Sequence, residues 1–140
     1  MTPLKICYAS AELAPFAKTG GLADVSSALC RFLHGAGHDV RPFLPLYAGI
    51  ERASLGLEPV DNVRDVEIPL GERYRFSLLR ARPEPAGPEI FFVHCPALYG
   101  RDALYTQDGD ELETCALDAG VERQERPHVM AGAVQVAAQR

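Results

Sequence analysis

A lysine and two glycines near the start of the chain are its clearest candidate for a chemical site. The stretch Lys18-Thr19-Gly20-Gly21 comes immediately before a segment with helical periodicity. Glycines let a backbone approach a ligand closely, and the first N–H groups of a helix have no partner within the helix. Together with the lysine ammonium, these groups attract an anion. The stretch therefore predicts a cradle for phosphate oxygens. The alternative is a plain loop that leads the chain into the helix.

The flanking residues predict a strand before this stretch and a helix after it. Residues 4–9 are a short apolar run, which is typical of a buried strand. The apolar residues that follow recur at helical spacing: Leu22, Val25, Leu29, Phe32, Leu33 and Ala36. This spacing predicts a helix that buries the stripe. Gly35 and Gly37 are expected to end it in left-handed backbone.

A second strand at residues 39–44 completes a strand–helix–strand unit. Such units fold right-handed into a parallel sheet, whose ligands bind beyond the carboxyl ends of the strands. Lys18 lies in that position, which favours the phosphate hypothesis. Pro42 lacks an N–H group, so we expect it in an edge strand or near the end of its strand.

The middle of the chain adds a hairpin and a third core strand. Residues 46–62 have no clear period and predict a surface connection with one helical turn. Strands at 63–70 and 74–82 flank a Gly71-Glu72-Arg73 turn, and residues 89–94 form another buried strand. The predicted fold class is therefore α/β, a partial Rossmann-like parallel sheet with an inserted β-hairpin.

Length and charge exclude several classes of protein. The 140 residues suit one domain. The formal net charge of −5 opposes a nucleic-acid surface, which needs a basic face. No apolar run approaches the roughly 20 residues needed to cross a bilayer, and no signal peptide begins at Met1. We therefore expect no nucleic-acid or membrane partner and a cytoplasmic location.

The four cysteines show neither metal-ligand nor redox spacing, because no C-x-x-C pair occurs. Cys7 lies in the first predicted strand and Cys30 on the apolar side of the predicted helix. Both are expected to be small buried hydrophobes in a reducing compartment. The residues thus indicate no metal and no other cofactor.

Longer motifs around the lysine resemble one enzyme family. Residues 10–25, SAELAPFAKTGGLADV, are similar to the opening of bacterial glycogen synthases and plant starch synthases. Residues 37–41, GHDVR, and 96–101, PALYGR, continue the resemblance. It covers about residues 3–111 and implies the N-terminal half-domain of a GT-B type glycosyltransferase, in which two Rossmann-like domains face each other across a cleft.

The resemblance also implies a reaction and site residues. Such enzymes transfer glucose from ADP-glucose to the end of an α-1,4-glucan such as glycogen, with retention of configuration. Lys18, Thr19, Gly20 and Gly21 would contact ADP-glucose through its phosphates. Asp24 would fix the loop and the sugar. An acidic residue in a first helical turn also complements the helix dipole, so both roles stay open for Asp24.

Two further side chains are expected near the sugars. Tyr99 would lie near the glucosyl or acceptor site, on the resemblance alone. Glu12 follows the first strand and either hydrogen-bonds a sugar or braces the loop. No catalytic residue is assigned within this chain. The resemblance implies that the essential groups lie in segments of full-length family members that this chain does not include.

Family members run to several hundred residues, so this chain is expected to be an inactive N-terminal fragment. Residues 1–111 would form part of the N-terminal domain. Residues 112–140 would be an atypical tail, not native family sequence, whose residues 129–138 could form a weakly apolar helix. We hypothesise a frameshift, an early stop or a misassembled gene, which reading the downstream DNA in the other frames would test.

Truncation would also leave an uncovered apolar sheet edge that favours self-association. Two non-enzymatic alternatives remain, namely a non-catalytic remnant and a weak anion-binding or nucleotide-binding Rossmann-like module. The sequence leaves open whether ADP-glucose or UDP-glucose is preferred.

Overall fold

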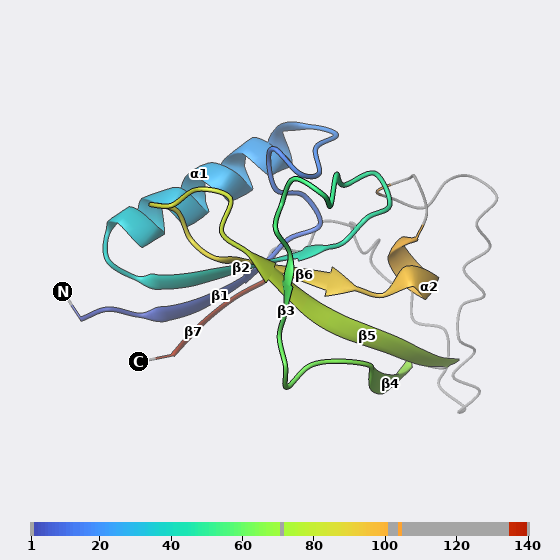
Figure 1. Ribbon diagram of the computed structural model, residues 1–140. Helices are drawn as coiled ribbons and strands as arrows, with labels where there is room; N and C mark the ends of the chain where they lie inside the picture. The colour runs from blue at the N-terminus through green and yellow to red at the C-terminus, as the bar shows by residue number, and fades with distance from the viewer. Residues whose placement is uncertain (1, 71, 101–103, 105–134, 140) are drawn as a thin grey trace, which may run out of the picture.

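The computed structural model describes residues 2–70, 72–100, 104 and 135–139. A mixed sheet carries one long helix on one face (Figure 1). In chain order the elements are β1 (Lys5–Ala9), α1 (Gly21–Gly35), β2 (Asp39–Pro45), β3 (Glu58–Pro59), β4 (Val66–Leu70), β5 (Glu72–Ala81), β6 (Ile90–His94), α2 (Pro96–Tyr99) and β7 (Gln135–Gln139). The sheet order is β3-β5-β6-β2-β1-β7, and β4 pairs with β5.

Three parallel strands form the centre of the sheet. β2 pairs in parallel with β1 on one side and with β6 on the other. This arrangement confirms the predicted α/β sheet with its strand–helix–strand unit. Because the carboxyl ends of parallel strands meet at one edge, the segments that follow Ala9, Pro45 and His94 leave the sheet together. The candidate site lies at this edge.

The predicted hairpin is confirmed and belongs to the same sheet, but the predicted Gly71-Glu72-Arg73 turn is wrong at Glu72 and Arg73, which already pair with β4 as part of β5. β4 pairs antiparallel along its whole length with the first half of β5. The second half of β5, from Ser77 to Ala81, pairs antiparallel with β6, and β3 pairs with β5. The hairpin is therefore joined to the parallel strands through the pairing of β5 with β6.

Both flanks of the parallel core are covered by antiparallel strands. β7 pairs with β1 along its whole length, and β5 pairs with β6. The expectation of an uncovered apolar edge is therefore wrong for the described residues. The expected helix at 129–138 is also wrong where that segment is described, because 135–139 form a strand. The free N–H and C=O groups along β1 favour such pairing over a helix.

Helix α1 packs on the sheet through its small residues. The predicted apolar stripe is wrong as the buried face, although Leu33 from it packs against the core at partial burial. Its buried residues are Ala23, Ser26, Ser27 and Cys30. The side chains of Val25, Leu29 and Phe32 are 61%, 37% and 72% exposed. Small side chains let the helix lie close to the strands, and the serine hydroxyls find partners there. Of the two glycines expected to end the helix in left-handed backbone, Gly37 does so at φ +88°, whereas Gly35 is still the last helical residue.

The core lies between α1 and the sheet and continues into the loop after β2. One cluster joins Ile6 and Tyr8 to Cys30. A second cluster contains Phe92 and also Leu46, with Tyr47 and Ile50 from the same loop. The expectation of a surface connection holds for residues 51–62, most of which are exposed, and is wrong for the buried start of the segment. The expected helical turn is wrong, and the short strand β3 lies in this segment instead. Apolar side chains without a period anchor this loop, and no helix occurs in it.

Pro42 lies in the middle of the central strand, so the expectation of an edge or strand end is wrong. The N–H of Asp39 donates to Leu4, and the carbonyl of Phe43 accepts from Ser10, so Asp39 and Phe43 face β1. Hydrogen-bonding groups alternate along a strand, so Pro42 faces β6. Pairing with β6 begins only at Phe43. The N–H that proline lacks is therefore not needed in the ladder.

Two cysteines were expected to be buried, and only one of those expectations holds. Successive side chains of β1 alternate between the two faces of the sheet. Ile6 and Tyr8 face α1, whereas Cys7 lies on the opposite face and is exposed. Cys30 is buried as predicted, and burial raises the pKa of its thiol to about 11.

Candidate functional site

Residues 10–20 form a compact loop at the carboxyl end of β1. Leu13 and Ala17 exchange backbone hydrogen bonds, with N···O distances of 3.0 and 3.1 Å. The Phe16 ring packs edge-on against Phe92 of β6, with ring centroids 5.6 Å apart. The loop thus has its own internal structure and is packed on the sheet before the helix begins.

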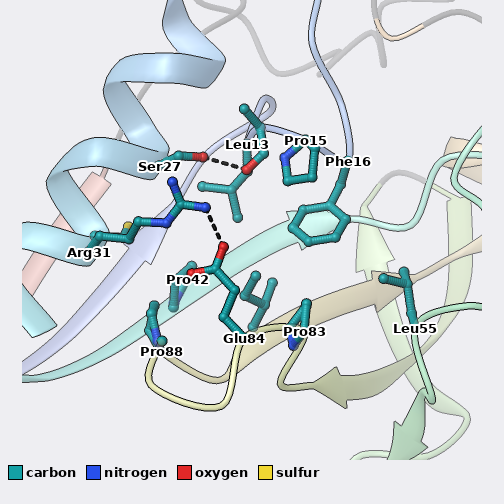
Figure 2. Close-up of a pocket in the computed structure, with 14 residues that line it drawn as sticks. Leu13, Pro15, Phe16, Ser27, Arg31, Pro42, Leu55, Pro83, Glu84 and Pro88 are labelled. Carbon is teal, nitrogen blue, oxygen red and sulfur yellow. Dashed lines mark hydrogen bonds and ion pairs between the residues drawn. The ribbon is translucent and has the colours of Figure 1, made fainter.

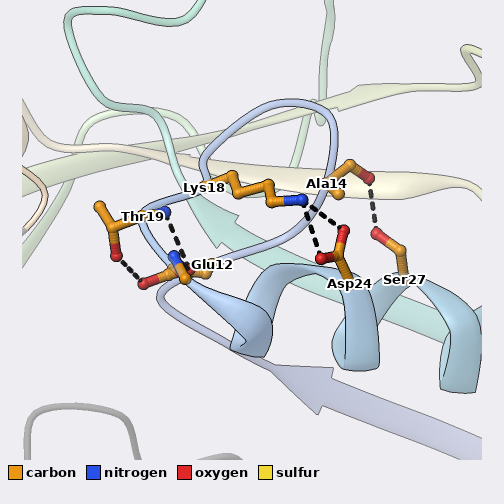
Figure 3. Close-up of polar contacts among 7 residues, drawn as sticks. Glu12, Ala14, Lys18, Thr19, Asp24 and Ser27 are labelled. Atoms are coloured by element: carbon orange, nitrogen blue, oxygen red, sulfur yellow. Dashed lines mark hydrogen bonds and ion pairs between the residues drawn. The ribbon is translucent and has the colours of Figure 1, made fainter.

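The serines of α1 hold this loop in place. The Ser27 hydroxyl donates to the carbonyl of Ala14 at 2.6 Å (Figure 3). The Ser26 hydroxyl lies 3.2 Å from the Ser10 hydroxyl and accepts from the Tyr8 hydroxyl at 3.2 Å. These bonds explain why α1 turns small polar side chains inward. The spacing of Ala23, Ser26, Ser27 and Cys30 is helical too, and it is the signal in the sequence that could have identified this face.

Glu12 is buried, and its carboxylate faces the turn that contains Thr19 and Gly20 (Figure 3). One carboxylate oxygen accepts from the N–H of Thr19 at 3.1 Å and from the N–H of Gly20 at 3.4 Å. The other accepts from the Thr19 hydroxyl. Of the two roles expected for Glu12, this geometry supports the brace.

Lys18 and Asp24 lie opposite each other where the loop meets α1. The Lys18 ammonium donates to both carboxylate oxygens of Asp24 at 2.8 Å (Figure 3). Both side chains are about half exposed. An exposed ion pair contributes only about 0.2–1 kcal/mol, so a more highly charged anion can displace Asp24 from the ammonium.

Gly20 and Gly21 begin the helix with an open backbone. Gly20 precedes the first turn with φ −153° and ψ −155°, and Gly21 is the first helical residue. Neither glycine has a positive φ, and a Cβ added to either would meet no heavy atom within 4 Å. Neither the turn nor the packing therefore requires glycine here. What glycine provides is a backbone that a ligand can approach closely.

Tyr47, which the sequence reasoning missed, connects the segments that leave the three parallel strands. Its hydroxyl donates to the carbonyl of Ala11 in the loop at 3.1 Å. Its ring meets the Tyr99 ring edge-on, with centroids 5.7 Å apart. Its position just beyond the carboxyl end of a core strand is the signal that could have identified it.

Tyr99 is half-buried in α2, after β6. Burial raises the pKa of its hydroxyl, and the neighbouring Cys95 thiol raises it further. Through Tyr47, the Tyr99 ring is linked to the loop that contains Glu12. The structure thus brings Tyr99 to the same edge of the sheet as the other predicted site residues. The Tyr47 side chain connects it to the loop backbone.

A mostly apolar cavity of about 330 Å³ lies behind the loop, between α1 and the turn at 83–88 (Figure 2). Leu13 and Phe16 of the loop form part of its wall. Arg31 of α1 pairs with Glu84 across it. The stretch 18–21 does not line this cavity. The cavity is therefore separate from the candidate anion site.

The described residues contain an ammonium group and backbone hydrogen-bond donors at the start of α1. Within them, no three His, Cys, Asp or Glu side chains gather as metal ligands would. In the same part of the chain, no helix has both the length and the apolar character to span a membrane. The Lys18 ammonium and the start of α1 lie next to each other in this part of the chain.

Comparison with known proteins decides the family. The sequence model of the starch synthase catalytic domain matches residues 5–125. The chain belongs to the starch synthase catalytic domain family. The resemblance inferred from the motifs is thereby confirmed. The match extends beyond residue 111, and the point where family sequence gives way to a tail stays a prediction.

Curated members of this family match over most of the chain. The glycogen synthase of Koribacter versatilis is 39% identical over 108 residues, which cover 76% of this chain and 22% of that protein. Glycogen synthase 1 of Geobacter sulfurreducens is 37% identical over 108 residues, covering 77% of this chain and 22% of that protein. The chain thus spans about a fifth of the length of these relatives.

A solved structure of the family has the same fold. The catalytic domain of starch synthase IV from Arabidopsis thaliana, bound to ADP and acarbose, superposes with a TM-score of 0.64 and 28% sequence identity. The match covers 76% of this chain and 22% of that chain. The predicted fold class, a partial Rossmann-like sheet from a GT-B type glycosyltransferase, is confirmed.

Proposed function

We propose that this chain is part of a glycogen or starch synthase and forms one wall of its ADP-glucose site. The complete enzyme transfers glucose from ADP-glucose to an α-1,4-glucan such as glycogen, with retention of configuration. Lys18, Thr19, Gly20 and Gly21 face the phosphates of the nucleotide sugar. Asp24 holds the Lys18 ammonium beside them until the phosphate takes its place.

The open backbone at Gly20 and Gly21 carries this proposal. An added Cβ at either position would meet nothing in the described chain, so the absence of a side chain benefits a partner outside it. A diphosphate at the N-terminus of α1 is such a partner, because the N–H groups and the helix dipole attract anions. Negative charge develops on this diphosphate as ADP leaves, and preset donors stabilise it.

The loop by itself is a weak phosphate site. Residues 10–24 contain one positive charge, Lys18, and two negative charges, Glu12 and Asp24, so their net charge is −1. A diphosphate therefore needs further cations from the rest of the enzyme. We expect the chain alone to bind ADP weakly and to transfer no glucose. The same charge count favours the second candidate function, a chain that binds nucleotide weakly without catalysis.

A chimera tests the first function with a positive readout. The 108 matching residues of this chain replace their counterparts in the Koribacter versatilis glycogen synthase. We expect the chimera to transfer glucose from ADP-glucose to glycogen, and Lys18→Ala to lower kcat/KM for ADP-glucose at least about tenfold, as expected when a charged hydrogen-bond donor is lost. Measuring UDP-glucose in parallel gives the nucleotide preference.

Lys5→Ala is the matched control, because Lys5 is an exposed lysine at the opposite end of β1. It should leave transfer unchanged. A folded chimera without transfer, made from an active parent, would contradict the proposal. So would a Lys18→Ala chimera that transfers glucose as well as the unsubstituted one.

We further propose that the chain functions in the cytoplasm. The three cysteines that the structure describes are free thiols, as expected in a reducing compartment. Fractionation of cells that express the chain at native level tests this location.

A further inference from the structure

We propose that Glu12 is the positioning residue of the phosphate-facing loop. Its carboxylate fixes the backbone of Thr19 and Gly20, and this backbone in turn sets the direction of the Lys18 side chain and of the first N–H groups of α1. The inference rests on the function proposed above, because it assigns Glu12 a role toward the same phosphate.

Glu12 fixes the residues that lead into α1, where no side chain caps the first turn. A helix usually begins with Ser, Thr, Asp or Asn, whose side chain accepts from a nearby backbone N–H. Here the residue before the first turn is Gly20, which has no side chain, and no side chain caps that turn. Glu12 instead accepts from the N–H groups of Thr19 and Gly20, just before the helix, and leaves the first helical N–H groups to a ligand. The loop therefore combines an open glycine backbone with a fixed helix start.

The carboxylate is a firm anchor because Glu12 itself is held. Its side chain is 2% exposed. Its carbonyl accepts from the Ser10 hydroxyl at 2.7 Å, and its N–H donates to the same hydroxyl at 3.3 Å. Ser10 in turn contacts Ser26 of α1. The anchor of the turn is thus connected to both the end of β1 and the interior face of α1.

The charge of Glu12 makes this role testable. A carboxylate near a phosphate repels it, which weakens binding. A carboxylate that orients the N–H donors strengthens binding. Substitutions can separate these two effects, because charge and geometry can be changed one at a time. We infer that the effect of geometry is the larger.

Two conservative variants make this separation. Glu12→Asp keeps the charge but withdraws the carboxylate by one methylene. Glu12→Gln removes the charge but keeps an oxygen of the same reach as acceptor. In an NMR titration of the 140-residue chain with ADP, we expect Glu12→Asp to weaken binding about tenfold, as expected when hydrogen bonds to a charged group are lost. Glu12→Gln should bind as tightly as the unsubstituted chain or more tightly.

Hydrogen exchange at the Thr19 and Gly20 amides gives a readout that needs no nucleotide. We expect both amides to exchange about tenfold faster in Glu12→Asp, because their acceptor has moved away. The Val40 amide in the central strand should not change. Glu84→Gln is the matched control, since it removes an exposed carboxylate of α1's ion pair with the turn at 83–88 and should change neither readout.

Three results would overturn the role of Glu12. One is unchanged ADP binding in Glu12→Asp, and another is unchanged exchange at Thr19 and Gly20. The third is weaker binding in Glu12→Gln than in Glu12→Asp, which would make the charge decisive. Failure of the unsubstituted chain to bind ADP, with the expected change in exchange, would instead reject the phosphate site and leave the anchoring of the loop intact.

Discussion

At the residue scale, two glycines have a conformation that any residue can adopt and a surrounding that any small side chain could fill. The role of these glycines in ligand binding can therefore be tested separately from their role in folding. In the chimera, Gly21→Ala should leave the free energy of unfolding unchanged or raise it by up to about 1 kcal/mol, because alanine favours the helix. It should lower kcat/KM for ADP-glucose at least about tenfold, because a methyl group would stand between backbone and phosphate.

Gly35→Ala is the control for this prediction. Gly35 is also in α1, and its added Cβ would likewise meet nothing. It should gain similar stability without loss of transfer. Equal transfer by both variants, measured alongside chemical denaturation, would show that the backbone at Gly21 meets no ligand.

Cys30 makes the stability of the fold depend on alkaline pH. The pKa of its thiol rises from 9.0 to about 11 through burial, so the folded state favours the neutral thiol. Stability from this group is fully present below pH 9 and is lost as the pH rises from 9 to 11, by roughly 2–3 kcal/mol. Urea denaturation at pH 8 and at pH 11 measures this loss.

Cys30→Ala should remove the loss between pH 9 and 10, whatever its own effect on stability at pH 8. The raised pKa of Tyr99 keeps a further loss above pH 10 with or without Cys30. The exposed Cys7 provides the comparison, because Cys7→Ala should keep the full loss between pH 9 and 11. An unchanged slope in Cys30→Ala would mean that another group controls alkaline unfolding.

At the element scale, the sequence predicted which segments form strands and helices better than which faces are buried. The strands at 39–45 and 90–94 and the bounds of α1 follow from local patterns of apolar residues. The buried face of α1 depends on how closely it approaches the strands and on which hydroxyls the loop requires. Both are properties of distant residues, so the helical period of apolar side chains could not reveal them.

The same limit applies to the site. The order strand, loop, helix placed Lys18 and the glycines at the carboxyl edge of the sheet, and the structure agrees. The sequence could not show that Glu12 turns inward to the loop backbone or that Tyr47 joins the loop to Tyr99. These contacts depend on register and side-chain direction in three dimensions.

Two substitutions in α1 test which face is buried. Phe32→Ser should change the free energy of unfolding by less than about 0.5 kcal/mol, because the ring is exposed. Ala23→Leu should lower it by about 1–3 kcal/mol, because the methyl group of Ala23 is fully buried and extra methylenes overfill the interface. The predicted apolar stripe would give the opposite order. Thermal or urea denaturation of both variants decides between the two faces.

At the scale of the whole molecule, both edges of the parallel core are paired with antiparallel strands. β5 and β7 flank the parallel strands, so the core does not depend on further strands at those positions. Self-association of the chain stays a prediction. It would use the two outer edges of the sheet, at β7 and β3. Residues 10–24, in contrast, have a net charge of −1, so the phosphate site that we propose there would take further cations from the rest of the enzyme.

The most direct measurement is a titration of the isotope-labelled 140-residue chain with ADP, followed by the amide signals. The loop at the start of α1 should respond first, with the largest shifts at Gly20 and Gly21. These shifts should saturate only at millimolar ADP, because residues 10–24 carry a net charge of −1. Glucose alone should leave these signals in place. Absence of shifts at Gly20 and Gly21, or shifts confined to the apolar cavity around Phe16 and Cys30, would contradict the assignment of this loop to the phosphates.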